Sequence, residues 1–169
     1  LSNAATVRTG RYYGQGEMGE LRRSAYAALL LSGFFAVLSV MLYLLFPEPL
    51  ISVFLGRGEP ERQAIIAIGT ALLAAAALFQ FADAAQVMAL GLLRGVQDTR
   101  VPMVIAAICY WLIGVPGAWF LGFRTTLGAQ GIWFGLVAGL VPAGTLMMVR
   151  FWRGQRRRET AQSASPSTG

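Results

Sequence analysis

Four long stretches without a charged residue constrain this chain more than any other feature. Each is at least 20 residues long, and they cover 24–47, 63–82, 101–123 and 125–149. A helix needs about 20 apolar residues to cross the hydrocarbon core of a bilayer. Lipid admits only helices and closed barrels, and the alternating strands of a barrel are not present. The sequence therefore predicts an all-α integral membrane protein with transmembrane helices near 24–46, 64–93, 102–122 and 130–151.

The composition supports this interpretation and excludes several functions. Hydrophobic residues make up 56% of the chain and charged residues 13%, where a soluble domain has about 25% charged residues. There is no His and a single cysteine, Cys109, so Ser-His-Asp and Cys-His nucleophile systems and Cys/His zinc sites are excluded within these residues. The chain has no Lys, so it carries no phosphate-binding P-loop. We therefore expect no enzyme activity, no metal or cofactor site and no nucleic-acid partner.

The basic residues predict how the helices are oriented. All 14 are Arg. Eleven of them fall in 1–23, 94–101 and the segment from Arg150 onward, whereas Arg57, Arg62 and Arg124 lie in the connections on the opposite side. Because basic residues are enriched in cytoplasmic loops, the sequence predicts a multi-pass protein of a bacterial cytoplasmic (inner) membrane with a cytoplasmic C-terminus.

The two ends of the chain differ from its body. Residues 1–7 are small and apolar and indicate the end of a preceding, fifth helix. Since the chain begins at Leu1 rather than Met, we expect it to be a piece of a longer protein. We divide it into a membrane domain over 1–152 and a disordered basic tail over 153–169. An apolar run at 50–55, too short to span, predicts a short interfacial helix.

Small residues and prolines predict how the spans pack. Gly131, Gly135 and Gly139 lie four residues apart, on one face of the last predicted helix, and glycines at that spacing let two helix backbones approach closely. Pro116 and Pro142 lie inside the third and fourth predicted spans. Each lacks a backbone N–H, so the sequence predicts a kink at both positions.

Asp83 is the one charged residue inside the four predicted spans apart from Arg150, which lies at the very end of the fourth. Along the helix Asp83 lies about 15 Å from Arg94, the nearest charged residue toward the predicted cytoplasmic end, and therefore close to the bilayer midplane. A carboxylate at that depth costs about 2.5–3.5 kcal/mol. A packing role, with Asp83 bonded to a neighbouring helix, is one explanation. The other is a proton or cation site, to which the amide oxygens of Gln80 and Gln86 could contribute.

Several segments together resemble the MATE (multidrug and toxic compound extrusion) transporters. These are NAATVRTG at 3–10, FADAAQV at 81–87, GLLRGVQDTRVP at 91–102, YWLIGVPG at 110–117 and LGAQGIWFGL at 127–136. The resemblance covers about residues 1–152. It implies a twelve-helix, two-lobe transporter, of which this chain would supply the end of helix 8 and helices 9–12 of the C-terminal lobe.

The resemblance also implies a function. A MATE-type antiporter exports drugs or other small organic compounds, often cationic, in exchange for H⁺ or Na⁺. Asp83 aligns with an acid on helix 10 of the family, and its usual partner, an acid on helix 7, lies outside this chain. Phe79 stands where some members have a tyrosine, which favours protons. Phe79, Tyr110 and Trp111 are candidates for lining the cavity. The partners would be the bilayer, the substrates and the N-terminal lobe.

Two other functions stay open from the sequence. A lipid-linked sugar flippase of the same superfamily would need a more cationic cavity, and the four predicted spans contain no Arg except Arg150 at the end of the fourth. A non-transporting membrane subunit or scaffold would be a complete short chain. Substrate identity and the choice between H⁺ and Na⁺ do not follow from these residues.

Overall fold

All the regular secondary structure of the described residues is helical. The computed structural model describes residues 1–55 and 61–164, with side chains as far as residue 160. Its elements are α1 (Ser2–Gln15), α2 (Met18–Leu45), α3 (Pro47–Ser52), α4 (Arg62–Gly95), α5 (Arg100–Ile108), the π-helical segment η1 (Cys109–Gly114), α6 (Val115–Phe123) and α7 (Ala129–Ala164). The predicted all-α class is confirmed.

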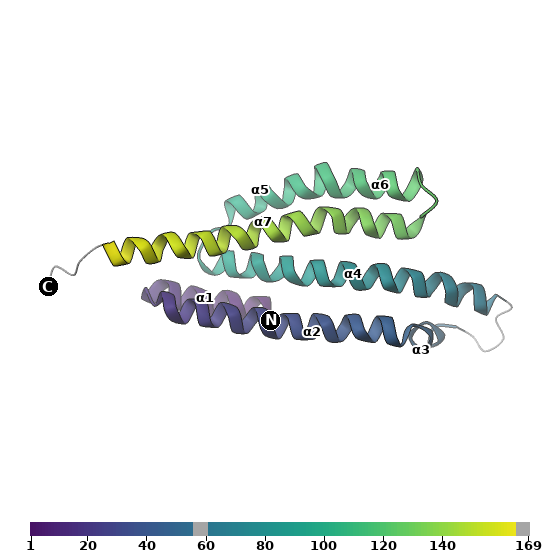
Figure 1. Cartoon of the computed structure of the whole chain (residues 1–169), viewed down its shortest axis with the longest axis horizontal. Coiled ribbons are helices and arrows are strands. Elements are labelled where there is room, and N and C mark those ends of the chain that lie inside the picture. Colours follow the sequence, from purple (N-terminus) through teal and green to yellow (C-terminus); the bar gives the residue numbers. More distant parts are fainter. Residues whose placement is uncertain (56–60, 165–169) are drawn as a thin grey trace.

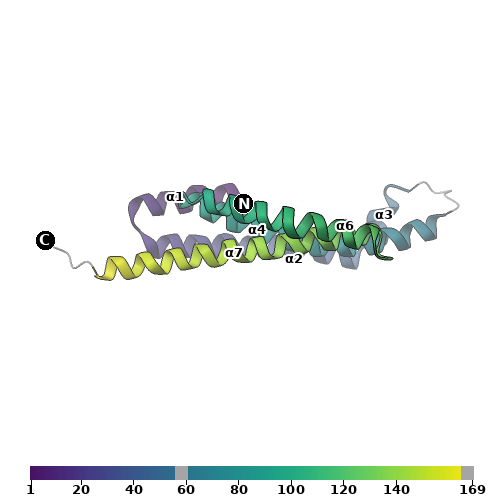
Figure 2. The ribbon, with the colours of Figure 1, turned by 90° about the horizontal axis from the view of Figure 1, so that it is seen from above.

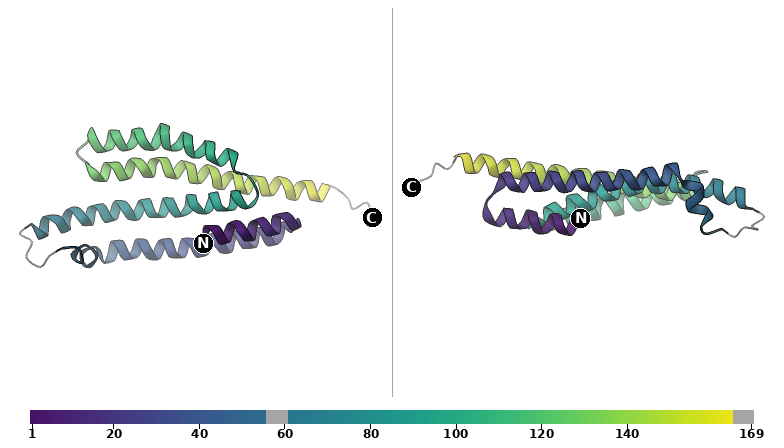
Figure 3. Two further views of the ribbon diagram at one scale, coloured as in Figure 1. Left: turned by 180° about the vertical axis from the view of Figure 1, so that it is seen from behind. Right: turned by 90° about the horizontal axis from the view of Figure 1, so that it is seen from below.

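The long helices form an elongated bundle in which α4 is the central element. Figure 1 shows α4 between α2 and α7, with α5 and α6 running along the other side of α7. The view from above shows that the bundle is thin in its third dimension (Figure 2). The short α1 packs against α2 and α4 at the end where the C-terminal turns of α7 also lie (Figure 3).

Four helical stretches are long and apolar enough to cross a membrane, as the sequence predicted: Met18–Leu45, Arg62–Gly95, Arg100–Phe123 and Ala129–Thr160. All four extend beyond the uncharged stretches that predicted them. The bilayer limits the apolar length of a spanning helix, but the backbone hydrogen bonds continue into the charged flanks. The outer surface of α2 carries large exposed apolar side chains, including Leu30, Phe34 and Leu45.

The short helix α3 begins earlier than predicted. It covers Pro47–Ser52 rather than 50–55, and residues 56–60 lie outside the described residues. Pro47 and Pro49 explain the shift, because a proline in the first turn of a helix loses no hydrogen bond. They therefore start a new helix immediately after α2 ends at Leu45.

The two membrane prolines act differently. Pro116 lies at the start of α6, directly after the π-helical turns of η1. The wider π-helical turns make room for the proline ring, which would clash with a carbonyl in the preceding turn of a regular α-helix. Pro142 lies inside α7, which continues through it as one helix.

The glycines of α7 let this helix contact the third span at backbone distance. A Cβ on Gly135 would lie 2.0 Å from the backbone nitrogen of Ala118, and one on Gly131 would lie 2.2 Å from the carbonyl oxygen of Leu121. At Gly139 the nearest atom, Cα of Gly114, would be 2.8 Å away. Since no side-chain atom fits at these distances, the contact of α7 with α6 needs glycine at 131 and 135, and its contact with η1 needs glycine at 139.

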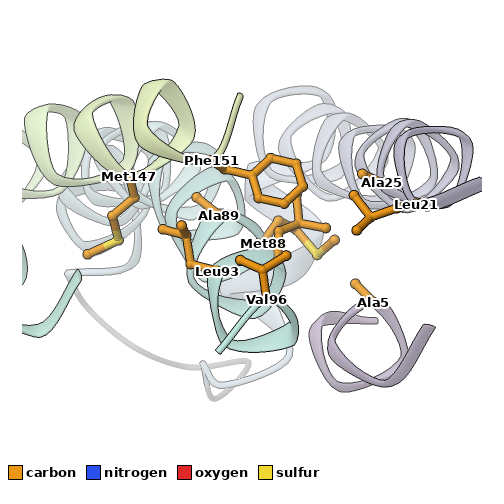
Figure 4. Close-up of a cluster of buried hydrophobic side chains, with 10 residues drawn as sticks. Ala5, Leu21, Ala25, Met88, Ala89, Leu93, Val96, Met147 and Phe151 are labelled. Atoms are coloured by element: carbon orange, nitrogen blue, oxygen red, sulfur yellow. The ribbon is translucent and has the colours of Figure 1, made fainter. Parts of the chain in front are cut away.

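The largest hydrophobic core lies where α1, α2, α4 and α7 meet. Figure 4 shows Phe151 and Met147 of α7 beside Met88 and Leu93 of α4, with Leu21 of α2 across from them. These side chains are buried. The core therefore joins the C-terminal half of α7 to the first two helices of the chain.

The prediction of a disordered tail is wrong for residues 153–164, because α7 continues to Ala164. Residues 165–169 lie outside the described residues. The extension is held by contacts to α1 and α2 that composition does not reveal. Arg22 Nη1 lies 3.0 Å from Glu159 Oε1, Arg158 lies 4.5 Å from the ring centroid of Tyr13, and Gln155 is buried.

Candidate functional site

The polar residues of the candidate site follow one another along the middle of α4. Gln80, Asp83 and Gln86 are three residues apart, and side chains at that spacing share one side of a helix. Gln80 and Asp83 are half-buried, whereas Gln86 is only 5% exposed. The sequence placed these residues correctly on one helix, and the structure adds which neighbouring helices they meet.

Gln86 connects α4 to the π-helical segment of the third span. Its Nε2 donates a hydrogen bond to the hydroxyl of Tyr110. Its Oε1 is buried and has no hydrogen-bond partner among the described residues. Gly144 of α7 closes the other side, where a Cβ would lie 3.3 Å from the Cα of Gln86. Gln86 thus lies at the junction of three elements, and its amide keeps an unused acceptor.

Asp83 forms no hydrogen bond or ion pair with any residue that the structure describes. Its carboxylate lies close enough to Tyr110 for an electrostatic interaction between the two side chains. The side chain is partly open at the surface of the bundle. The interaction that Asp83 makes with another element is thus with a phenol, and none of the ion pairs among the described residues involves it.

An aromatic and aliphatic wall flanks these polar groups. Ala82, Val137 and Leu140 form a small buried cluster, against which Phe79 and Tyr110 pack. Phe79 also meets Trp133 of α7 edge-on, with ring centroids 5.2 Å apart. The structure therefore brings two of the three predicted cavity residues to the same junction of α4, α7 and η1.

Trp111 does not join this group. Its side chain is 72% exposed, whereas the adjacent Tyr110 is half-buried. Consecutive residues of a helix do not face the same way, so only one of the pair can contact α4. The structure thus places Trp111 away from the junction of Phe79, Gln86 and Tyr110, and its role in lining a cavity stays a prediction.

Comparison with known proteins gives this arrangement a context. The MatE family model matches residues 1–120. The "Probable multidrug resistance protein NorM" of Rhizobium meliloti (strain 1021) is 40% identical over 165 residues, which are 98% of this chain and 35% of that protein. The "Multidrug resistance protein NorM" of Burkholderia vietnamiensis is 38% identical over 89% of this chain and 33% of its own length. The chain thus spans about a third of the length of these relatives.

Solved structures agree on the fold. The inward-facing conformation of a multidrug resistance MATE family transporter of the MOP superfamily superposes with a TM-score of 0.79 over 94% of this chain and 36% of that chain, at 19% identity. A MOP superfamily transporter from Pyrococcus furiosus gives a TM-score of 0.78 at the same identity. Because the family model covers most of the chain and the relatives cover nearly all of it, this chain belongs to the MatE family, the multidrug and toxic compound extrusion transporters.

Proposed function

We propose that the full-length protein carrying this chain is a secondary active antiporter that exports drugs or other small organic compounds, often cationic, in exchange for H⁺ or Na⁺. Asp83 would be the coupling residue. The observation that carries the proposal is a carboxylate in the middle of α4 with no hydrogen bond or ion pair to any described residue. The names of the relatives, which are multidrug resistance proteins, support the drug class.

The energetics favour a coupling role over a packing role. A carboxylate in the middle of a bilayer costs about 2.5–3.5 kcal/mol. A packing Asp would offset this cost by bonding to a neighbouring helix, and Asp83 has no such bond within the described residues. A group left in this state is suited to gain and lose a proton or cation during each transport cycle.

The residues around Asp83 fit this exchange. The unpartnered Oε1 of Gln86 is a neutral oxygen of the kind that coordinates Na⁺ or accepts a hydrogen bond from hydronium. Tyr110 holds the Gln86 amide in place through its hydroxyl. Gln80, one turn earlier on α4, could contribute a second amide oxygen. The N-terminal lobe of the same protein would supply the remaining wall of the pathway.

A transport assay of the full-length protein in proteoliposomes tests the proposed function. We expect an imposed proton gradient or an imposed Na⁺ gradient, without ATP, to drive movement of a cationic dye such as ethidium against its concentration gradient. Collapsing the effective gradient with an ionophore should stop the movement, and liposomes without protein are the control. Dye movement that requires ATP, or no movement with either gradient, would contradict the proposal.

The proposal includes an orientation, which cysteine labelling tests. With 11 Arg on one side and 3 on the other, the turn between α4 and α5 should be cytoplasmic and the turn between α6 and α7 external. In a cysteine-free background, Arg124→Cys should react with an impermeant maleimide on intact cells, whereas Asp98→Cys should react only after the cells are opened. Labelling of position 98 from outside would reverse the topology.

A further inference from the structure

A cavity of about 510 Å³ lies between α2 and the C-terminal half of α7, and Asp83 does not line it. The polar and aromatic residues that line it include Arg22, Tyr26, Trp152, Arg153, Gln155 and Arg156. It exists only because α7 continues as a helix past residue 152, where the sequence indicated disorder. Neither the coupling site nor the glycine contact contributes to it.

The cavity crosses the boundary between the apolar and the charged parts of both helices. Its apolar end is formed by Leu29, Met148 and Val149, which belong to the uncharged stretches. Its other end is formed by charged residues that lie beyond these stretches. At the boundary the rings of Tyr26 and Trp152 stack with centroids 4.7 Å apart, and such aromatic residues are enriched at the headgroup level of membranes.

The charged end of the cavity is cationic. Three guanidinium groups and one carboxylate, that of Glu159, line it, which leaves a net charge of +2. Arg22 neutralises Glu159, with Nη1 lying 3.0 Å and 3.2 Å from the two carboxylate oxygens. Arg153 and Arg156 are exposed and form no ion pair with a described residue. Two guanidinium groups therefore stand free for an anion.

A polar group at the cavity wall has unused hydrogen-bonding capacity. Gln155 is 3% exposed, and its Oε1 has no hydrogen-bond partner among the described residues. A buried amide in this state is unfavourable by itself, because it loses water without gaining a partner. Because Gln155 lines the cavity, a rotation of its amide toward the cavity would let a ligand hydroxyl next to the anionic group supply the missing donor.

We propose that this cavity binds the headgroup of an anionic, hydroxyl-bearing phospholipid, with the phosphate at Arg153 and Arg156 and the upper part of the acyl chains along Leu29 and Met148. A soluble phosphate ester would satisfy the arginines equally well. It would leave the apolar end, which lies at the depth of the acyl chains, without an occupant. The combination of a cationic end, an aromatic boundary and an apolar end favours the lipid.

Binding of phosphatidylglycerol to the full-length protein in neutral detergent tests the proposal. Native mass spectrometry would count bound lipid during titration, with phosphatidylcholine as the zwitterionic reference. The double variant Arg153→Gln/Arg156→Gln should lose about thirtyfold in phosphatidylglycerol affinity, since each arginine near a lipid headgroup contributes about a factor of five. The matched control Arg94→Gln/Arg157→Gln removes the same charge from exposed positions outside the cavity and should lose less than about threefold.

A fluorescence measurement makes the test independent of these variants. Phosphatidylglycerol with brominated acyl chains should quench the wild-type protein more than Trp152→Phe, a substitution that keeps an aromatic ring against Tyr26. Equal losses in the two double variants would overturn the proposal, because they would indicate diffuse attraction to anionic surfaces. Glycerol phosphate binding as tightly as phosphatidylglycerol would also overturn it, in favour of a soluble ligand.

Discussion

Asp83→Asn in the full-length protein is expected to abolish gradient-driven efflux while expression and membrane insertion persist. Asn preserves the size and the hydrogen-bonding capacity of the side chain, but it can neither release a proton nor carry a negative charge. An exchange cycle needs a group that alternates between a charged and a neutralised state. We therefore expect transport to fall to the level of empty liposomes, whereas a packing role would tolerate Asn.

The experiment measures drug resistance of cells and ion-driven dye efflux at matched membrane levels. Asp83→Glu keeps the charge and should retain part of the activity. Gln86→Ala removes the amide beside Asp83 together with its bond to Tyr110 and should reduce efflux without abolishing it. The control is Asp98→Asn in the turn between α4 and α5, whose carboxylate lies 2.6 Å from Arg150 of α7; efflux should survive this change.

Wild-type efflux by Asp83→Asn would assign Asp83 to packing and move the coupling acid to a part of the protein outside this chain. Loss of efflux in Asp98→Asn to the same degree would show that the assay reports general damage to the helix packing. Comparing the two Asp→Asn variants therefore shows whether efflux depends on the carboxylate of Asp83 in particular or falls whenever a carboxylate of this chain is removed.

Gly135→Ala is expected to have the largest effect on stability of any single added methyl group in α7. The new Cβ would lie 2.0 Å from the backbone nitrogen of Ala118. Because the obstacle is backbone rather than a flexible side chain, α6 and α7 would have to move apart along their shared face. Overpacking typically costs about 1–3 kcal/mol, and a backbone clash belongs at the upper end of this range.

Gly33→Ala in α2 is the matched control, because it adds the same methyl group to another membrane helix where nothing lies within 4 Å of the new atom. The midpoint of thermal unfolding of each full-length variant in detergent, monitored by size-exclusion chromatography of heated samples, would measure the change in stability. The midpoint should fall for Gly135→Ala, fall less for Gly139→Ala and stay unchanged or rise for Gly33→Ala. Equal midpoints for Gly135→Ala and Gly33→Ala would contradict the close α6–α7 contact.

The sequence alone predicts those features that the bilayer dictates. The uncharged stretches located all four membrane helices, and the break at Pro47 located the end of α2. Local rules of this kind do not depend on the rest of the fold. The continuation of α7 to Ala164 escaped prediction because it depends on Arg22 and Tyr13, which lie more than a hundred residues away along the chain.

The candidate site was predictable to a similar extent. Asp83 stood out because a charge inside an apolar helix is rare, and Gln86 followed from its spacing. The bond from Gln86 to Tyr110, the unpartnered Oε1 and the outward position of Trp111 depend on how the third span rotates beside α4. This rotation is set across η1, whose π-helical geometry has no clear signature in the residues at 109–114.

The π-helical segment also affects how this chain should be aligned with its relatives. A π-helical turn contains about one residue more than an α-helical turn, so η1 shifts by one position the relation between residue number and helix face. Some relatives could have an uninterrupted α-helix in the third span. An alignment without a gap would then pair residues that face different neighbours in the two proteins, either before or after η1. Placing a single-residue gap within 109–114 restores equivalence on both sides, so that Tyr110 and Ala118 are each compared with residues that face the same neighbours.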